Sequence, residues 1–194
     1  MATVHVIGSV QSASFVDAPG AAAAFCVWEL RFGEAWGVLR GEAGGTTQTA
    51  AACGEHEPGG APGAGRSCAW EQPVDVTLRC ASLCGWPTLQ LTLWKQDEGG
   101  ANEVCGYGCA RVPPGPGLHA LEMACWRPEG SALQELAAAF LGGGLPHLTD
   151  ATMVARPLEG RRHAVASATA ACVRVELNVL CKGFAERGIA FEDE

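Results

Sequence analysis

Hydrophobic and polar residues alternate along several stretches of this 194-residue chain. In one of them Leu89, Leu91 and Leu93 alternate with Gln90 and Thr92, which is the period-two pattern of a β-strand buried on one face. Comparable extended stretches predict further strands at 3–10, 26–32, 36–40, 74–78, 103–112, 117–125 and 173–179. The pattern therefore predicts about eight strands.

Turn residues mark where these strands should end. Gly33 separates the stretches 26–32 and 36–40, so we expect those two strands to form a hairpin. Pro113 and Pro114 lack a backbone N–H and should end the strand before them. Trp126-Arg127-Pro128 is expected to break the strand at 117–125.

One helix is predicted after the strand at 117–125. Ser131 with Gln134 forms a capping box, in which each side chain bonds a backbone N–H at the helix start. An apolar face and a terminal glycine follow, formed by Leu133, Leu136, Phe140 and Gly142. Strands without βαβ alternation, plus this helix, predict an all-β fold. We expect an antiparallel β-sandwich with one helix in a connection.

The composition favours a single folded domain over residues 1–184. Hydrophobic residues make up 48% of the chain and charged residues 18%, which is enough apolar material for a core. Residues 50–67 carry Gly or Pro at seven of eighteen positions and are expected to form a flexible insertion. A linker between two domains is the alternative, but the strand pattern continues on both sides. Residues 185–194 are expected to be an acidic tail.

Net charge and cysteine usage narrow the class of protein. A formal charge of −8 disfavours binding to nucleic acid or, for the chain as a whole, to an anionic membrane. The ten cysteines follow an N-terminus without the features of a signal peptide, so we expect reduced thiols. The apolar runs are shorter than the roughly 20 residues that a spanning helix needs. We therefore expect a soluble intracellular protein.

The sequence shows no familiar catalytic motif. It lacks a phosphate-binding loop, a nucleophile elbow and a zinc-protease helix. Gly106 and Gly108 flank Tyr107 inside a predicted strand, where glycines indicate a bulge or a close backbone approach. We predict no enzyme and no cofactor; an enzyme with an unfamiliar site is the alternative.

Two CxxxC pairs could in principle hold a zinc ion. They are Cys80 with Cys84 and Cys105 with Cys109. In an extended strand such residues lie about 13 Å apart, too far to share one ion. Only a turn between Cys80 and Cys84 would bring one pair together, so we interpret these residues as small hydrophobic core side chains.

The loop after Trp94 resembles a calcium-binding loop that has lost a ligand. Leu93-Trp94-Lys95-Gln96-Asp97, with Gly106 and Val112-Pro113 after it, resembles the strand, loop and strand of C2 domains. The resemblance implies two aspartates, two residues apart, as calcium ligands. Asp97 matches the second, but Lys95 stands in place of the first, which removes an oxygen donor and adds a repelling charge. With only Asp17 as a possible acid in the first loop, we predict no calcium binding.

A more specific resemblance covers residues 4 to about 184. The matching strings are Val4-His5-Val6-Ile7-Gly8, Phe25-Cys26-Val27-Trp28, Trp70-Glu71-Gln72-Pro73-Val74-Asp75, Gly85-Trp86-Pro87, Gly106-Tyr107-Gly108, Trp126-Arg127-Pro128 and Leu141-Gly142-Gly143-Gly144. In this order they resemble the B9 domain family.

The B9 resemblance implies a C2-like, non-enzymatic, cytoplasmic protein at the ciliary transition zone and basal body. It implies assembly with other B9 proteins, including B9 domain-containing protein 1 and the Meckel syndrome type 1 protein. The complex would support cilium formation and gate the entry of membrane proteins into cilia.

Two surfaces are candidates for binding. Trp86-Pro87 and Trp126-Arg127-Pro128 are candidate partner contacts, because Trp and Arg are enriched in interface hot spots; the alternative is that both Trp plug the sandwich ends. A rival hypothesis is a calcium-independent, lipid-binding C2-type domain that touches membrane through the mildly basic C-terminal third. Arg161 and Arg162 would then contact lipid.

Overall fold

The computed structural model describes residues 2–16, 21–54, 65–131, 133, 147–148, 154, 167–189 and 191. The strands are β1 (Ala2–Phe15), β2 (Ala23–Arg31), β3 (Trp36–Gly41), β4 (Gly44–Thr46), β5 (Ala50–Ala51), β6 (Ser67–Cys80), β7 (Thr88–Gln96), β8 (Asn102–Arg111), β9 (Gly117–Pro128) and β10 (Ser167–Lys182), followed by the 3-10 helix η3 (Ala185–Arg187). Every predicted strand is present. The helix predicted from Ser131 lies, apart from Ser131 and Leu133, outside the described residues.

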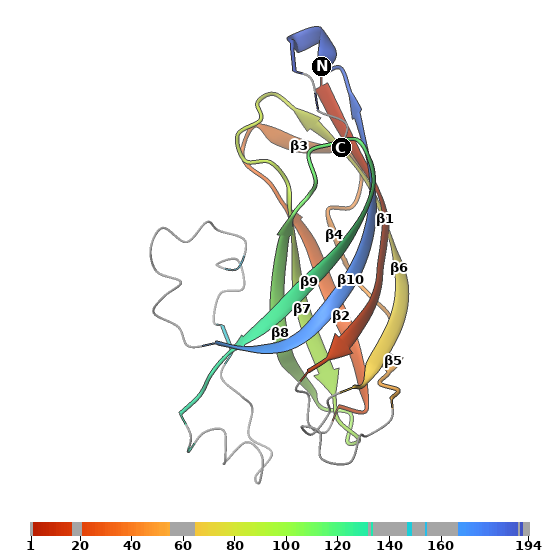
Figure 1. Cartoon of the computed structure of the whole chain (residues 1–194), viewed down its shortest axis with the longest axis vertical. Coiled ribbons are helices and arrows are strands. Elements are labelled where there is room, and N and C mark those ends of the chain that lie inside the picture. The colour runs from red at the N-terminus through yellow and green to blue at the C-terminus, as the bar shows by residue number, and fades with distance from the viewer. Residues whose placement is uncertain are drawn as a thin grey trace.

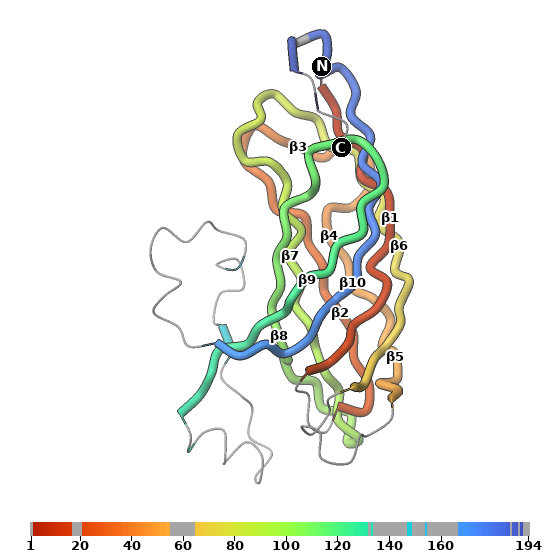
Figure 2. The backbone as a smooth tube through the Cα atoms, viewed as in Figure 1, coloured from red at the N-terminus to blue at the C-terminus, as the bar shows by residue number. Residues whose placement is uncertain are grey.

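The strands form one antiparallel sheet that curls into two layers (Figure 1). Their order is β3-β6-β1-β10-β9-β8-β7-β2-β4, and β5 pairs with β2. One layer contains β6, β1, β10 and β9, and the other contains β8, β7 and β2 (Figure 2). The predicted antiparallel β-sandwich is confirmed.

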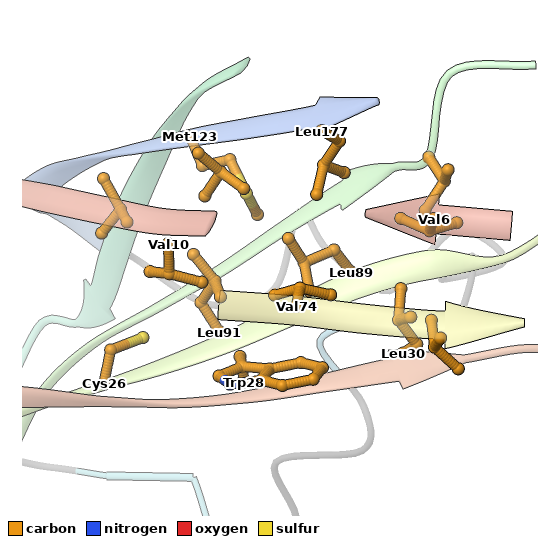
Figure 3. Packing of buried hydrophobic residues seen from close by; sticks show 14 of the residues in the cluster. Val6, Val10, Cys26, Trp28, Leu30, Val74, Leu89, Leu91, Met123 and Leu177 are labelled. Atoms are coloured by element: carbon orange, nitrogen blue, oxygen red, sulfur yellow. The ribbon is translucent and has the colours of Figure 1, made fainter. Parts of the chain in front are cut away.

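The core lies between the two layers, where apolar side chains point toward one another (Figure 3). Val6, Val10 and Leu177 face Trp28, Leu89 and Leu91, and all six are at most 4% exposed. The alternation seen in the sequence explains this arrangement, because every second residue of each strand points inward. The indole N–H of Trp70 on β6 also donates a hydrogen bond across the layers to the carbonyl oxygen of Ala24, at 3.0 Å.

The sheet turns from one layer to the other between β8 and β9. These strands share the single residue pair Tyr107 and Trp126, and the register of β8 against β7 shifts between Leu93 and Trp94. A Cβ atom added to Gly108 would lie 2.8 Å from the Cys125 sulfur, and one on Gly106 would lie 3.2 Å from the Ala170 Cβ. The interpretation of these glycines as marking a bulge and a close approach is confirmed.

The predicted hairpin between the second and third strands is wrong. β3 pairs with β6, with Val38 opposite Leu78, whereas β2 pairs with β4, β5 and β7. The chain crosses layers after β2 because Trp36 is held at the end of the sandwich. Its indole N–H donates to the Cys84 carbonyl oxygen at 3.0 Å, and its ring packs edge-on against Trp86.

The predicted break at Trp126-Arg127-Pro128 is also wrong. β9 continues to Pro128, with Trp126 opposite Thr169 and Pro128 opposite Ser167. Pro128 is the last residue of the strand, a position at which a strand can accommodate a proline without losing an interior ladder hydrogen bond.

Candidate functional site

The candidate binding residues that the structure describes lie at the two ends of the sandwich and where β8 meets β9, between the layers. We call the end with Lys95, Asp97 and Glu103 the ionic end. The end with Trp36, Trp86, Phe184 and Phe191 is the aromatic end, and the start of β1 and the end of β10 lie near it (Figure 1).

At the ionic end, Lys95 stands where the C2-type loop would carry an aspartate, and it pairs with Glu103. Lys95 on β7 is directly opposite Glu103 on β8. The Lys95 Nζ atom lies 3.2 Å from the Glu103 Oε2 atom, and the Lys95 side chain is 13% exposed. The partly buried ammonium thus has a carboxylate beside it, which offsets the cost of taking it out of water.

Asp97 uses its carboxylate to close its own turn. Its Oδ1 atom accepts a hydrogen bond from the Ala101 backbone N–H at 2.8 Å. The Asp97 carbonyl oxygen accepts one from Gly100 N–H at 3.0 Å, and Gly100 has a φ of +83°, where glycine is favoured. The carboxylate therefore caps the β7–β8 turn.

These contacts bear on the prediction that calcium does not bind. Among the residues that the structure describes, no three His, Cys, Asp or Glu side chains are grouped to hold a metal ion. Asp17 lies outside the described residues. The Lys95–Glu103 pair and the capping role of Asp97 support the prediction, which stays a prediction until it is titrated.

The cysteines of the two CxxxC pairs differ in their surroundings. Cys80 and Cys105 are buried, Cys109 is half-buried and Cys84 is exposed. Core thiols elsewhere are strongly desolvated: burial raises the pKa of Cys125 to about 12, with smaller contributions from neighbouring thiols. Such thiols are protonated at neutral pH and so are poor nucleophiles and metal ligands.

Trp86 forms the centre of the aromatic end. It is 7% exposed, and its indole N–H donates to the Val112 carbonyl oxygen at 2.7 Å. The Trp36 ring packs edge-on against it with centroids 5.1 Å apart, and the Phe184 and Phe191 rings lie 6.5 and 6.2 Å away. In this chain Trp86 plugs the sandwich end, and it offers little surface to a partner.

Neighbouring segments complete the aromatic end. Pro87 is buried, and its carbonyl oxygen accepts a hydrogen bond from Val112 N–H at 3.0 Å. The segment expected to be a tail begins with η3, and its Phe191 also packs edge-on against Phe184, at 5.2 Å. The packed domain thus extends past residue 184, at least to Phe191.

The second tryptophan corner lies at the turn between the layers. Trp126 is half-buried beside the Tyr107 ring, at a centroid distance of 5.9 Å. Arg127 is 8% exposed and Pro128 is buried. Leu148 N–H donates to the Tyr107 hydroxyl at 2.9 Å, and burial raises the pKa of that hydroxyl. Partner contact here stays a prediction, and Trp126 is the residue of the three with the most accessible surface.

The two arginines predicted to contact lipid lie where the structure gives no description. Arg161 and Arg162, the candidate lipid contacts, lie outside the described residues. Lipid contact through them therefore stays a prediction.

Sequence reasoning missed an apolar cluster on the outside of the sandwich. Ile7, Leu118 and Leu180 are 40%, 66% and 49% exposed. Each occupies a position where the alternation of its strand calls for a polar residue, which is the signal that could have found them.

Comparison with known proteins supports one family. The chain matches the B9-C2 family, described as "Ciliary basal body-associated, B9 protein", over residues 4–180. It is 35% identical to human B9 domain-containing protein 2 over 97% of this chain and 99% of that protein. The Drosophila melanogaster protein of that name is 30% identical over 99% of this chain and 100% of that one. B9 domain-containing protein 1 of Xenopus laevis is 26% identical over 95% of this chain and 87% of that protein.

A solved C2A domain of plant extended synaptotagmin 1 is similar with a TM-score of 0.40 and 12% identity, over 91% of this chain and 92% of that one. This likeness is too weak to support a conclusion. In the described ranges no helix combines the length and apolar character needed to span a bilayer. The match over residues 4–180 and the near full-length relatives show that this chain belongs to the ciliary basal body-associated B9 protein family.

Proposed function

We propose that this chain is a non-enzymatic subunit of the ciliary transition-zone complex. It assembles there with other B9 proteins, among them B9 domain-containing protein 1 and the Meckel syndrome type 1 protein. Through this assembly it contributes to cilium formation and to the gating of membrane proteins that enter cilia.

The observation that carries the proposal is that the B9 domain occupies nearly the whole chain. The family match covers residues 4–180, and relatives named B9 domain-containing protein 2 are matched over 98–100% of their own length. The residues that the structure describes form one sandwich, and its surface is where partners would make contact. The polar side chains of its candidate cation loop bond to other groups of the same loop and its flanking strands. This fits a protein that binds other proteins rather than one that binds a cation or catalyses a reaction.

Reconstitution tests the assembly directly. The purified chain is mixed with purified B9 domain-containing protein 1 and Meckel syndrome type 1 protein, and the mixture is separated by size-exclusion chromatography. We expect the chain to co-elute with at least one of them. If folded proteins elute separately at micromolar concentrations, the assembly proposal is wrong.

Localisation tests the cellular part of the proposal. In ciliated cells that lack the endogenous relative, the tagged chain should concentrate between the basal body and the axoneme and restore the fraction of ciliated cells. A tagged chain that is expressed and folded but spreads through the cytoplasm would contradict it.

The remaining partner-binding hypothesis is tested by paired tryptophan variants. Trp126→Ala should weaken binding to the B9 partner about tenfold or more if Trp126 is a hot spot. Trp94→Ala is the matched control, because Trp94 is also half-buried and stacks on Phe25 at 5.8 Å on the outside of the other layer. If both variants bind the partner as tightly as the unchanged chain does, Trp126 is not part of the contact surface.

The rival lipid-binding function is tested by sedimentation with phosphoinositide liposomes, with and without charge reversal at Arg161 and Arg162.

A further inference from the structure

The outside of the layer β6-β1-β10-β9 presents an ordered row of exposed and half-buried side chains. The strand register places Leu118, Asn178, Ile7 and Asp75 side by side across the four strands. In the next row toward the aromatic end, Leu180 lies opposite His5. Leu180 is thus a diagonal neighbour of both Ile7 and Leu118, and side chains of this size reach one another at such positions. We call this surface the outer face.

The charge of the outer face reverses along the strands. Lys182 and Arg79 lie in one row at the aromatic end, both opposite Thr3 on β1, and both are exposed. Glu176 lies toward the other end, opposite Ser9, and Asp75 lies in the row of Ile7, with its Oδ1 atom 2.9 Å from the His5 Nε2 atom. The outward positions of β10 therefore read Glu176, Asn178, Leu180 and Lys182, from negative through uncharged to positive.

Beyond Glu176 the face carries a pair that neutralises itself. The Arg174 Nη2 atom lies 3.0 Å from the Glu122 Oε1 atom, and the two residues are opposite each other in the register. Lys182 and Arg79 thus lie on one side of the apolar cluster, and Glu176 and Glu71, whose Oε2 atom accepts a hydrogen bond from the Ser9 hydroxyl at 3.3 Å, lie on the other.

We propose that the outer face binds the outer face of a second copy of this chain. A two-fold axis lying between the two faces and perpendicular to the strands reverses the strand direction. Lys182 of one copy then lies over Glu176 of the other, and the same contact occurs twice. The apolar side chains of Leu180 and Ile7 are enclosed between these two contacts. A face with a single sign of charge would repel its own copy, whereas this reversal makes the face complementary to itself.

The size of the face sets the strength of the contact. Four strands about 4.8 Å apart and the four outward rows from Lys182 to Glu176, about 6.7 Å apart, give a face of roughly 500 Å² per copy. The dimer would bury on the order of 1,000 Å² in total, at the small end of specific interfaces. We therefore expect a dimer that dissociates in the micromolar range. This inference goes beyond the proposed ciliary assembly and requires only the purified chain.

Charge-swap variants test the contact. In sedimentation equilibrium from about 1 to 300 µM, a range that brackets micromolar dissociation, the unchanged chain should shift from monomer to dimer. Lys182→Glu and Glu176→Lys should each weaken dimerisation about tenfold or more, because each places like charges opposite one another twice. An equimolar mixture of the two variants should restore the dimer, since every contact in the mixed dimer again joins opposite charges.

Controls separate this effect from misfolding and from net charge. Glu29→Lys makes the same charge change as Glu176→Lys but lies on β2, in the other layer, so it should leave dimerisation unchanged. Circular dichroism and thermal melts should show that all variants fold.

Three results would overturn the proposal. The first is a monomer at every concentration. The second is a dimer that neither swap weakens. The third is a loss of dimer in the single variants without recovery in their mixture. Association of the outer face with B9 domain-containing protein 1, without self-association, would assign the face to that protein and overturn the homodimer.

Discussion

The two ends of the sandwich are closed by different forces. At the aromatic end, Trp36, Trp86, Phe184 and Phe191 pack together, and the Trp86 indole N–H has a carbonyl partner. At the ionic end, the Lys95–Glu103 pair and the Asp97 turn take that role. Buried aromatic rings contribute several kilocalories per mole, whereas a partly exposed ion pair contributes about 1 kcal/mol or less. We infer that the aromatic end stabilises the domain and that the ionic end is the more tolerant of change.

Removing the central ring of the aromatic end should have the largest effect. We expect Trp86→Ala to lower the free energy of unfolding by about 3–5 kcal/mol, because it leaves a cavity and an unpaired Val112 carbonyl oxygen. Urea denaturation followed by circular dichroism measures the change.

The matched control for Trp86→Ala is Trp94→Ala. Trp94 stacks on Phe25 outside the core and is half-buried, so its loss should cost less than half as much. If both variants lose a similar free energy of unfolding, the aromatic end does not stabilise the domain more than other aromatic pairs do.

Phe191 tests whether the segment after residue 184 belongs to the aromatic end. It is half-buried against Trp86 and Phe184. Phe191→Ala should therefore lower the free energy of unfolding by about 1.5–3 kcal/mol, less than a fully buried phenylalanine would. Phe191→Leu, which keeps apolar volume, should recover more than half of the loss. An unchanged denaturation midpoint for Phe191→Ala would show that the domain ends earlier.

A charge-removing variant tests the ionic end. Lys95→Met keeps the length of the side chain but leaves Glu103 without its ammonium partner, so we expect a loss of about 0.5–1.5 kcal/mol. The double variant Lys95→Met with Glu103→Gln should recover part of that loss, as a double-mutant cycle would reveal. If Lys95→Met lowers the free energy of unfolding as much as Trp86→Ala does, the two ends stabilise the domain equally and the inferred difference between them is wrong.

Calcium should have the smallest effect. A micromolar site would add about 4 kcal/mol at a thousandfold excess of calcium, which corresponds to a rise of roughly 8–16 °C in the unfolding temperature. We expect 1 mM calcium chloride to leave the unfolding temperature within about 1 °C of its value in EDTA. Micromolar affinity in a calorimetric titration would contradict this expectation.

The alternation of residue types predicted the strands and their inward faces, but not which strands are neighbours. Val74, Val76 and Leu78 alternate clearly and are buried as expected. Nothing in the alternation of β3 shows that it pairs with β6 rather than β2, because burial of a face is independent of the identity of the neighbouring strand. That choice depends on Trp36, whose partners lie about fifty residues away in the sequence.

The candidate site was harder to predict for a related reason. Lys95 could be interpreted from its type alone, because a lysine is unsuited to bind a cation wherever the loop lies. Trp86 could not, since tryptophan is common both in protein interfaces and in domain cores. Its contacts with Trp36, Phe184 and Phe191 decide between the two roles, and these residues are scattered along the chain.

The place of β1 has a consequence for how the protein is made. β1 is the first of the described strands to be synthesised, yet one of its two neighbours, β10 (Ser167–Lys182), is the last of them. The nascent chain therefore carries an unpaired edge of β1 until β10 has been synthesised, and such edges promote aggregation. A premature stop codon anywhere before β10 would make that exposure permanent. Loss of the last strand should therefore yield an insoluble product rather than a shortened working domain.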